Sequence, residues 1–387
     1  MTDNIITCNA GSNSLKCAVY DADSLSLIYR FGVDRIHDES TLTIRDAEGE
    51  KLVDEQSIES GYEEALSNIL KWYDDNGNGK IIAAGHRVVH GGKEFDDPVK
   101  INKEVRKKIE ALIPLAPLHQ PYNLKLIDIL YERYPSMQQV ACFDTSFHRT
   151  QPWVAQQFAL PRDLVEKEDI LRYGFHGLSY EYIVQALPEH IGSLEDKRIV
   201  VAHLGSGASM CAIKDGKSIA TTMGFTALDG LMMSKRCGDL DPGVILYLMQ
   251  EKGMSAEDIE KLLYQESGLL GTSGISADMR DLDGKENVQA KQAVDLFCYT
   301  AAKHLGGLIT VMGGLDYLVF TGAMGCGDFF IRAKICDYLK WMKMSVDEVA
   351  NANHNIIISA EQSSIPVVVL PTDEEQVIAG HTKKLLT

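Results

Sequence analysis

The sequence predicts an α/β protein built from two related domains. Strand-like apolar runs alternate with helical periodicity along the chain, and polar loops recur after the strands. The chain has 387 residues, which is more than one ordinary domain contains. Residues 7–21 can also be laid over residues 201–215 without a gap, which places Gly11 on Gly205 and Cys17 on Cys211. This repeated strand, glycine turn and strand predicts a duplication, with two domains facing one another across a phosphate chain.

The composition is typical of a soluble globular protein and argues against several functional classes. Hydrophobic residues make up 45% of the chain, and the formal net charge of −17 argues against a surface for nucleic acid or anionic membranes. The first residues lack the pattern of a signal peptide, and the eight scattered cysteines indicate reduced thiols, so we expect a cytoplasmic protein. Only residues 305–327 raise the question of a membrane span. Their glycine pairs and Asp316 break this run into a helix end and a strand.

Periodicity and turn residues give a coarse map of the elements. In the first half, strands are predicted at 4–9, 15–20, 25–31, 41–44, 81–89 and 139–143, and helices at 63–73, 103–112 and 123–131. In the second half, strands are predicted at 199–202, 210–213, 317–321 and 367–370, and helices at 256–266, 287–306, 329–342 and the C-terminus. The prolines of residues 114–121 predict a stiff, non-helical loop that presents His119. Residues 322–328 are predicted to be a glycine loop facing the N-terminus of the following helix.

The polar residues of these loops suit phosphoryl transfer. Glycines 205 and 207 leave backbone N–H groups unshielded, as in a phosphate cradle, although an ordinary hairpin turn would look the same. Arg87 and Arg236 offer a planar two-point grip on an anion; surface ion pairs are the alternative. Asp144 and Glu374 could bind magnesium or serve only as caps and turns. His119 and His176 could donate to a transferring phosphoryl group or be structural. Phosphoryl transfer needs such positioning and charge neutralisation.

Eight motifs, in order and at the expected spacing, resemble the acetate kinase family. These motifs are residues 9–16, 86–92, 114–121, 143–148, 172–177, 203–209, 223–242 and 371–375. The resemblance implies the superfamily of acetate and sugar kinases, Hsp70 and actin, with two ribonuclease-H-like domains and a central cleft. It implies a cytoplasmic homodimer that transfers phosphate between ATP or ADP and a short carboxylate, acetate or propionate, with Mg²⁺ or alternatively Mn²⁺. Residues 1–148 with 376–387 would form the acyl and phosphate side, and residues 149–375 the nucleotide side.

The resemblance also implies roles for individual residues. Arg87 and Arg236 would hold the acyl carboxylate and the transferring phosphoryl group, and His176 would stabilise the transition state. The transfer path would be lined by Asn9, His119, Asp144 and His176, and the metal would be bound by Asn9 and Glu374. The acyl pocket would be walled by Val89, Leu118, Phe175 and Ala227. The nucleotide would be contacted by Ser12, Ser14, Lys16, His203, Gly205, Ser206, Gly207, Asp278, Met279, Arg280, Gly322, Ala323, Met324 and Gly325.

The chain departs from the family pattern at several of these positions. Ser206 stands where the family usually has Asn, which shortens one phosphate contact. Ala227 stands where the family usually has Pro, which could admit a longer acid, whereas Val89 is larger than its counterpart in relatives that prefer propionate. One methylene discriminates by only about 1–3 kcal/mol, so we expect acetate with some propionate activity. Residues 322–327 read GAMGCG instead of the usual GGIGEN, which could weaken adenine binding or change the donor.

The first hypothesis is therefore an acetate kinase acting by direct in-line transfer. The second keeps the chemistry but changes the partners, as in a propionate or butyrate kinase or a pyrophosphate-dependent enzyme. The third is a nucleotide-dependent switch or filament protein on the actin-type fold, because fold does not fix function. The motif at residues 86–92 and the proline-rich loop argue against this third hypothesis, since a switch needs no acyl pocket.

Overall fold

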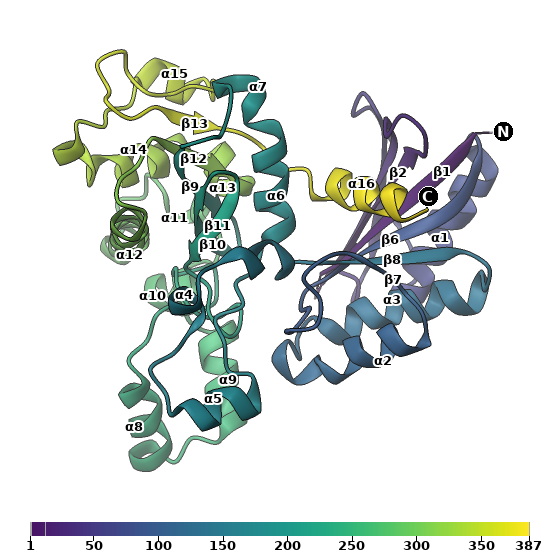
Figure 1. The fold of residues 1–387 in the computed structure, drawn as a ribbon, viewed down its shortest axis with the longest axis horizontal. Coiled ribbons are helices and arrows are strands. Elements are labelled where there is room, and N and C mark those ends of the chain that lie inside the picture. Colours follow the sequence, from purple (N-terminus) through teal and green to yellow (C-terminus); the bar gives the residue numbers. More distant parts are fainter. Residues whose placement is uncertain (1, 12, 387) are drawn as a thin grey trace. The chain divides into compact units, whose positions relative to one another are not determined.

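The computed structural model describes residues 2–386 except Ser12 (Figure 1). Its chain forms two compact units, Met1–Ser146 with Asp373–Thr387, and Phe147–Thr372. Each unit is built around a mixed β-sheet. None of the helices in the described residues combines the length and the apolar character needed to cross a lipid bilayer. All eight cysteines lie among the described residues, and all are free thiols.

The first unit contains a sheet with the strand order β5-β4-β3-β2-β1-β6-β8-β7. The strands β1, β6 and β8 are parallel, and β1 to β5 form an antiparallel meander. The strands are β1 (Asp3–Ala10), β2 (Ser14–Asp21), β3 (Leu27–Asp34), β4 (Thr41–Asp46), β5 (Lys51–Ser57), β6 (Lys80–Val88), β7 (Val99–Lys100) and β8 (Gln138–Phe143). The helices are α1 (Tyr62–Asn76), α2 (Lys103–Ala111), the 3-10 turn η1 (Ile113–Leu115), α3 (Gln120–Arg133) and α16 (Glu374–Leu386).

Helices cover both faces of this sheet. On one face, α1 and α3 pack their apolar side chains against alternate strand residues such as Ile6, Cys8 and Ala84. The helix α16, yellow in Figure 1, packs against β1, β2, β6 and β8. It approaches β6 at Gly85, where an added Cβ would lie 2.3 Å from Thr382 Oγ1 and 2.5 Å from Ile378 Cγ2. The glycine therefore sets how closely this helix packs on the sheet.

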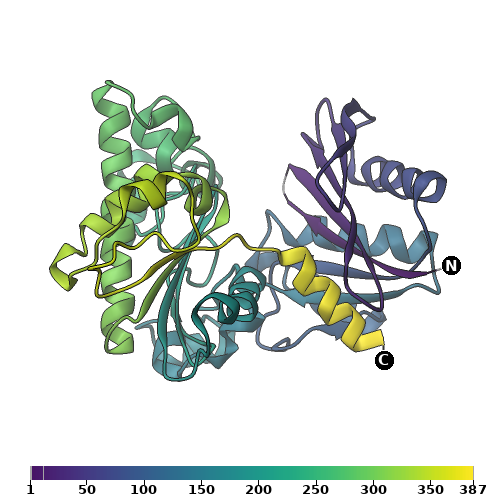
Figure 2. The same ribbon diagram turned by 90° about the horizontal axis from the view of Figure 1, so that it is seen from above.

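The second unit contains a smaller sheet with the strand order β11-β10-β9-β12-β13. Its strands are β9 (Arg198–Leu204), β10 (Ala208–Lys214), β11 (Lys217–Thr221), β12 (Tyr317–Thr321) and β13 (Val367–Val369). Its helices are η2 (Ser146–Thr150), α4 (Trp153–Gln156), α5 (Arg162–Glu168), α6 (Gly177–Ala186), α7 (Pro188–Ile191), α8 (Pro242–Lys252), α9 (Ala256–Gln265), α10 (Gly268–Ser273), α11 (Met279–Leu282), α12 (Val288–Met312), α13 (Gly322–Gly327), α14 (Phe329–Asp337), η3 (Lys340–Met342) and α15 (Glu348–Ala352). The helix α6 packs on one face of the sheet, and the long helix α12, green in Figure 2, packs against β9, β10 and β11.

The two units share a five-strand core, which confirms the predicted duplication. The order β3-β2-β1-β6-β8 in the first unit matches β11-β10-β9-β12-β13 in the second, and each neighbouring pair has the same relative direction. The overlay without a gap is wrong after the turn, however. Ala10 pairs with Leu15, whereas Leu204 pairs with Ala208, so the first turn holds one more residue than the second. By register, Cys17 corresponds to Met210 and not to Cys211.

Several predicted loops are helical, and three strands, β5, β7 and β11, were missed. Gln120 and Pro121 belong to α3, because a proline in the first turn of a helix loses no hydrogen bond. Residues 268–273 and 322–327 form α10 and α13 despite their glycines. The helix α12 continues past Gly306 to Met312, where Gly313 takes the left-handed conformation that ends it, before β12 begins. Strand β5 was not predicted because most of its side chains are exposed and show no alternation.

Candidate active site

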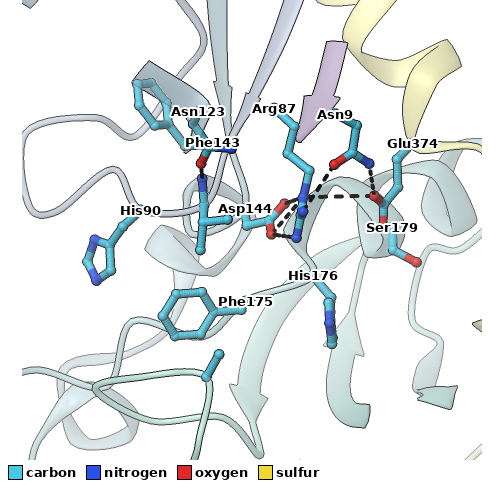
Figure 3. A network of polar contacts seen from close by, with 12 residues as sticks. Asn9, Arg87, His90, Asn123, Phe143, Asp144, Phe175, His176, Ser179 and Glu374 are labelled. Carbon is cyan, nitrogen blue, oxygen red and sulfur yellow. Dashed lines mark hydrogen bonds and ion pairs between the residues drawn. The ribbon is translucent and has the colours of Figure 1, made fainter. Parts of the chain in front are cut away.

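Three parallel strands of the first unit bring Asn9, Arg87 and Asp144 to one edge of the sheet. Asn9 lies near the end of β1, Arg87 near the end of β6, and Asp144 directly after β8. The carboxyl ends of parallel strands meet at the same edge, where α/β proteins commonly bind ligands. Arg87 lies two residues after Gly85, so its side chain emerges on the face that α16 covers. The strands and α16 thus bring Asn9, Arg87, Asp144 and Glu374 of the first unit together (Figure 3).

Arg87 is held on two sides by polar partners. Its Nε donates to both carboxylate oxygens of Asp144 at 3.1 Å, and its Nη2 donates to Asp144 Oδ2 at 2.5 Å. Its Nη1 donates to Asn9 Oδ1 at 3.1 Å. The Asp144 side chain is 1% exposed and that of Arg87 is 16% exposed. Although burial alone would lower it, the pKa of Arg87 is raised by the carboxylates of Asp144 and Glu374, so the guanidinium stays charged.

Glu374 adds a second carboxylate to this cluster. Its Oε2 accepts a hydrogen bond from Asn9 Nδ2 at 3.5 Å and lies 3.9 Å from Arg87 Nε. Burial raises the pKa of the Glu374 carboxyl to about 7; Arg87 opposes this rise, and Asp144 and Glu375 add to it. Because the rise comes first from burial of the charged form, a cation bound beside this carboxylate would favour its ionised form.

The start of α16 fixes where Glu374 lies. Asp373 accepts a hydrogen bond from the backbone N–H of Gln376 at 3.0 Å, as a residue at a helix N-cap does. Arg30 forms ion pairs with Asp373 and, at 3.8 Å, with Glu375. Tyr20 also donates to Asp373, at 3.4 Å. These contacts hold the residues on both sides of Glu374.

The donor set of Asn9 and Glu374 fits a hard divalent cation. Mg²⁺ prefers oxygen ligands and typically takes one or two carboxylates together with water and substrate phosphates. Glu374 offers a carboxylate, and Asn9 Oδ1 keeps a second lone pair beside the hydrogen bond from Arg87. Lys16 lies directly across from Asn9 in the β1–β2 ladder and is exposed, so it shares the face of this cluster.

The residues predicted to wall the acyl pocket in this unit are Val89 and Leu118. Val89 is 3% exposed, and its backbone N–H donates to Asn123 Oδ1 at 3.1 Å. Asn123 Nδ2 donates in turn to the carbonyl of Ala10 at 3.3 Å, so one side chain of α3 ties the ends of β1 and β6 together (Figure 3). Gln120 holds the next residue, His90, through its backbone N–H and carbonyl at 3.2 and 3.0 Å. Leu118 is half-buried beside the start of the same helix.

The other predicted residues of the first unit lie near these elements. His119 is the N-cap residue of α3, and its carbonyl accepts from the backbone N–H groups of Tyr122 and Asn123. Ser14 begins β2, and its carbonyl accepts from the N–H of Gly11 at 2.9 Å. Ser12 lies outside the described residues.

In the second unit, His176 and Arg236 converge on the glycine turn at residues 205–207. A Cβ built on Gly207 would lie 3.4 Å from both His176 Nε2 and Arg236 Nη2. His176 is the N-cap residue of α6, and its Nδ1 is 2.8 Å from Ser209 Oγ. Arg236 Nη1 donates to the carbonyl of Ala227 at 2.7 Å, which ties this arginine to a predicted acyl-pocket residue. Two basic groups therefore lie beside backbone that carries no side chain.

His203 extends this group of residues. It lies near the end of β9, and its ring stacks on that of His176 with centroids 4.3 Å apart. Its Nδ1 is 2.7 Å from Ser179 Oγ. Ser206 is exposed at the tip of the turn, and its carbonyl accepts from the N–H of Ser234 at 3.2 Å. The described residues of this turn thus offer backbone N–H groups between two imidazoles and a guanidinium.

Residues Gly322 to Gly325 form the start of α13 at the end of β12. Gly322 has φ 79°, and a Cβ there would lie 2.6 Å from the carbonyl oxygen of Leu204, so only glycine fits this close approach. The exposed Ala323 and half-buried Met324 follow in the same turn. The sequence predicted a glycine loop here, followed by the N-terminus of a helix at residue 329. Instead, the helix that begins at the end of β12 is α13, and the longer α14 follows it. The wholly buried Arg332 donates to the carbonyls of Gly325 and Cys326 and fixes the end of this short helix.

The remaining predicted nucleotide residues lie at α11. Asp278 caps this helix by accepting from the N–H of Arg280 and also pairs with the Arg280 guanidinium at 2.5 Å. The Arg280 side chain is 87% exposed, whereas Met279 is buried. Phe175 is also buried, and its carbonyl is 2.9 Å from His148 Nε2.

Sequence reasoning missed several residues that support the site. Those that contact predicted site residues are Ser179, Ser209, Asn123 and Arg332, and Gln120, Arg30 and Tyr180 act one step further away. Arg332 carried a detectable signal, because a lone Arg stands in the otherwise apolar first turn FFIR of α14. The others are small or polar residues whose partners lie far away in the sequence, so no local pattern identifies them.

Comparison with known proteins places the chain in a family. The family model described as the Acetokinase family matches residues 4–380. The chain is 47% identical to the acetate kinase of Methylocella silvestris over 399 residues, covering 100% of this chain and 98% of the relative. Among solved structures, it is similar to a propionate kinase from Francisella tularensis (TM-score 0.93, 34% identity, 99% of each chain) and to the acetate kinase of Porphyromonas gingivalis (TM-score 0.89, 37% identity, 100% of each chain). The expected fold and the resemblance inferred from the motifs are confirmed, and the chain belongs to the acetokinase family.

Proposed function

We propose that the chain catalyses the reversible, Mg²⁺-dependent transfer of a phosphoryl group between ATP and acetate, which gives acetyl phosphate and ADP. The observation that carries the proposal is the Arg87 guanidinium, held by Asp144 and Asn9 beside Glu374. The identity of 47% to the acetate kinase of Methylocella silvestris over the whole chain supports the same reaction.

We propose a direct in-line reaction. A carboxylate oxygen of acetate attacks the γ-phosphorus of ATP, the bond from that phosphorus to the β–γ bridging oxygen breaks, and its electron pair stays on ADP. Phosphoryl transfer of this kind depends on positioning and charge neutralisation. Arg87 holds the carboxylate and neutralises charge, and Arg236 and His176 donate to the oxygens of the transferring group. Asp144 keeps the Arg87 fork oriented through contacts to its Nε and Nη2.

Asn9 and Glu374 would hold the metal ion, for which Mg²⁺ is the first choice and Mn²⁺ the alternative. When bound, the ion supplies positive charge to phosphate oxygens. Glycines 205 and 207, with Ser206 and His203, would bind the nucleotide phosphates through backbone N–H groups and imidazole. Ser12, Ser14 and Lys16 are proposed to contact the same phosphates. The start of α13 and the Asp278–Arg280 pair, with Met279 between them, would bind adenosine.

The acyl pocket would be formed by Val89, Leu118, Phe175 and Ala227, and His119 would line the transfer path. Propionate is a second substrate candidate, favoured by the similarity to the propionate kinase from Francisella tularensis at a TM-score of 0.93. Alanine at position 227 offers more room than the family's usual proline, and Val89 takes room away, so we expect acetate to be preferred by a modest factor.

We further propose a homodimer in a reducing, cytoplasmic compartment. Eight free thiols favour such a compartment. All residues of the helix α8 are described, and none of them is buried, although several are apolar. The side chains that are each at least 40% exposed include Val244, Leu246, Tyr247 and Met249. An apolar helix that its own chain does not cover is typical of a surface that meets another protein.

The experiment that tests the function traps acyl phosphate with hydroxylamine. The purified protein is incubated with Mg²⁺, with acetate, propionate or butyrate as acceptor, and with ATP, GTP or pyrophosphate as donor. We expect the largest kcat/KM with acetate and ATP, followed by propionate. If no acyl phosphate formed with any pair, the proposed function would be wrong; if only pyrophosphate served, the proposed donor would be wrong.

A further inference from the structure

His176 is connected to a buried tyrosine through one serine hydroxyl. His176 Nδ1 lies 2.8 Å from Ser209 Oγ, and Ser209 Oγ lies 2.5 Å from the hydroxyl oxygen of Tyr180. Ser209 and Tyr180 are both 0% exposed. The short chain of contacts runs from α6, which carries Tyr180, through β10 and back to the residue that caps α6.

Three arrangements of protons can make both hydrogen bonds. In the first, Tyr180 donates to Ser209, and Ser209 donates to an unprotonated Nδ1 of His176. In the second, a protonated Nδ1 donates to Ser209, and Ser209 donates to Tyr180. In the third, Tyr180 and a protonated Nδ1 both donate to Ser209, which has two lone pairs. Within the described chain, Ser209 Oγ contacts only His176 and Tyr180, so in this arrangement its own buried proton lacks an acceptor, which disfavours the third arrangement.

The surroundings of Tyr180 favour the first arrangement. Its ring lies among apolar and aromatic side chains, including Phe147 and His148. Its hydroxyl group forms its hydrogen bond with Ser209. In the second arrangement, the phenol proton would be buried without an acceptor, which disfavours that arrangement by roughly tenfold or more. Burial also raises the pKa of the Tyr180 hydroxyl well above its usual value, so the phenol keeps its proton.

A neutral imidazole without a proton on Nδ1 carries it on Nε2. His176 Nε2 is the atom that lies beside Gly207 and, with Arg236 Nη2, nearest to the glycine turn. The N–H group therefore points to the place where the proposed function requires a donor to phosphate oxygens.

We propose that Tyr180 and Ser209 are positioning residues that hold His176 in the tautomer protonated on Nε2. The inference rests on the proposed function, in which His176 donates to the transferring phosphoryl group. Tyr180 and Ser209 act through His176 and need not touch the substrate.

The test combines a spectroscopic readout with kinetics. In protein labelled with ¹⁵N-histidine, the His176 signals are assigned by comparison with His176→Gln, and the two ring nitrogens report the tautomer directly. We expect a protonated Nε2 in the wild type and a mixture of tautomers in Tyr180→Phe. We also expect kcat to fall by about threefold to tenfold in Tyr180→Phe, with little change in KM for ATP or acetate. Ser209→Ala should show the same spectroscopic change.

Tyr73→Phe is the matched control, because it removes another buried tyrosine hydroxyl, one that donates to the carbonyl of Asn78 in the first unit. It should change neither the His176 signals nor kcat. A wild-type His176 protonated on Nδ1, or a tautomer that stays the same in Tyr180→Phe, would overturn the inference. A changed tautomer with unchanged kcat would show that the contacts exist but do not serve the reaction. A wild type that forms no acyl phosphate would refute the proposed function instead, and the spectra would still report on the tautomer.

Discussion

Arg87 is an example of a side chain whose geometry matters as much as its charge. Its Nε and Nη2 both donate to Asp144, while Nη1 reaches Asn9, so the planar guanidinium is fixed on two edges. Lysine would keep the positive charge but could make only point contacts. We therefore expect Arg87→Lys to lower kcat/KM for acetate by about 10²–10³, because a donor aimed at developing charge is typically worth that much.

Arg106→Lys is the control for this prediction. Arg106 also donates to an aspartate through Nε and Nη2, at 2.8 Å each, but it lies between α2 and α3 away from the strand ends. Its replacement should leave kcat/KM unchanged. Equal losses in the two variants, measured by the hydroxylamine assay, would show that Arg87 supports the fold and not the reaction.

At the residue scale, the sequence identified the charged residues of the candidate site more readily than the polar residues that hold them in place. Arg87, Asp144 and Glu374 stand next to glycines or strand ends, which is a local signal, and the structure brings them together. Ser209 and Asn123 gave no such signal, because their importance comes from partners 33 and 34 residues away. The roles of these residues in the reaction remain predictions that the variants test.

At the scale of elements, Gly85 determines how α16 packs on β6. A Cβ at this position would lie 2.3 Å from Thr382 Oγ1 and 2.5 Å from Ile378 Cγ2, so Gly85→Ala must push the helix away. We expect a loss of about 1–3 kcal/mol in the free energy of unfolding, which is typical of overpacking. Because α16 begins with Glu374, we also expect weaker Mn²⁺ binding, measured by electron paramagnetic resonance.

Gly32→Ala is the matched control, since Gly32 lies in β3 of the same sheet and an added Cβ would meet no atom within 4 Å. It should change stability by less than about 0.5 kcal/mol, as for an ordinary surface substitution. If Gly85→Ala were as stable as Gly32→Ala, close packing of α16 would not be needed to hold Glu374.

Asn123 joins two strands from a third element. Its side chain accepts from Val89 N–H and donates to the Ala10 carbonyl, and it is 1% exposed. Asn123→Ala leaves both backbone groups without this partner, so we expect the free energy of unfolding to fall by about 2–6 kcal/mol, since each unsatisfied buried group costs about 1–3 kcal/mol. Because Val89 is proposed to wall the acyl pocket, KM for acetate should rise more than KM for ATP.

Asn68→Ala offers a comparison, because Asn68 donates to the carbonyl of Glu64 within α1 and is only half-buried. It should alter neither KM value. Both variants are tested by urea unfolding and by measuring KM for acetate and for ATP. A rise in KM for ATP alone in Asn123→Ala would contradict the proposed position of Val89 in the acyl pocket.

Element boundaries were predictable where periodicity was strong and less so where glycine or proline dominated. The hairpin of β1 and β2 and the helix α1 were predicted within a few residues. The proline at position 121 was interpreted as excluding a helix, yet it occupies the first turn of α3, where no donor is needed. Residues 322–327 were interpreted as a loop because three of them are glycines. Gly322 is instead required by its close approach to Leu204, a contact that exists only in the folded sheet.

At the scale of the whole molecule, the proposed homodimer needs a surface, and α8 offers one. Leu246 and Tyr247 are 54% and 49% exposed on a helix with no buried residue. We expect Leu246→Glu to shift the molar mass in light scattering from twice 42.8 kDa toward 42.8 kDa, because a charge at the centre of an apolar interface would be desolvated without a partner. A substitution on the exposed β5, Leu52→Glu, should leave the mass unchanged.

The duplication was predictable from the sequence, but the register of its second strand was not. Both sheets have the same order and directions over five strands. The turn after β1 is one residue longer than the turn after β9, and the matching cysteines at 17 and 211 concealed this difference. A shift by one residue turns every side chain of a strand to the opposite face. The register of the second strand could therefore be determined only from the pairing of the strands in the structure.

Buried histidines make the stability of both units depend on pH. Burial lowers the pKa of His86 in the first unit and of His148 in the second to about 4, from an ordinary value of about 6.5. Between these values, the unfolded chain binds protons that the folded chain does not. Each histidine's contribution is therefore fully present above about pH 6.5, and about 3 kcal/mol of it is lost as pH falls to about 4.

Glu374 acts in the opposite direction, because its pKa is raised to about 7 and its protonated form is favoured in the folded state. A comparison of wild type with His86→Gln at each pH cancels this effect, since Glu374 is common to both. We expect the stability advantage of the wild type over His86→Gln, measured by urea unfolding, to shrink by about 2 kcal/mol between pH 7 and pH 5. His148→Gln should behave in the same way. A difference that stays constant across this range would show that the two rings are protonated as easily in the folded chain as in the unfolded one, and burial would then not be what holds them neutral.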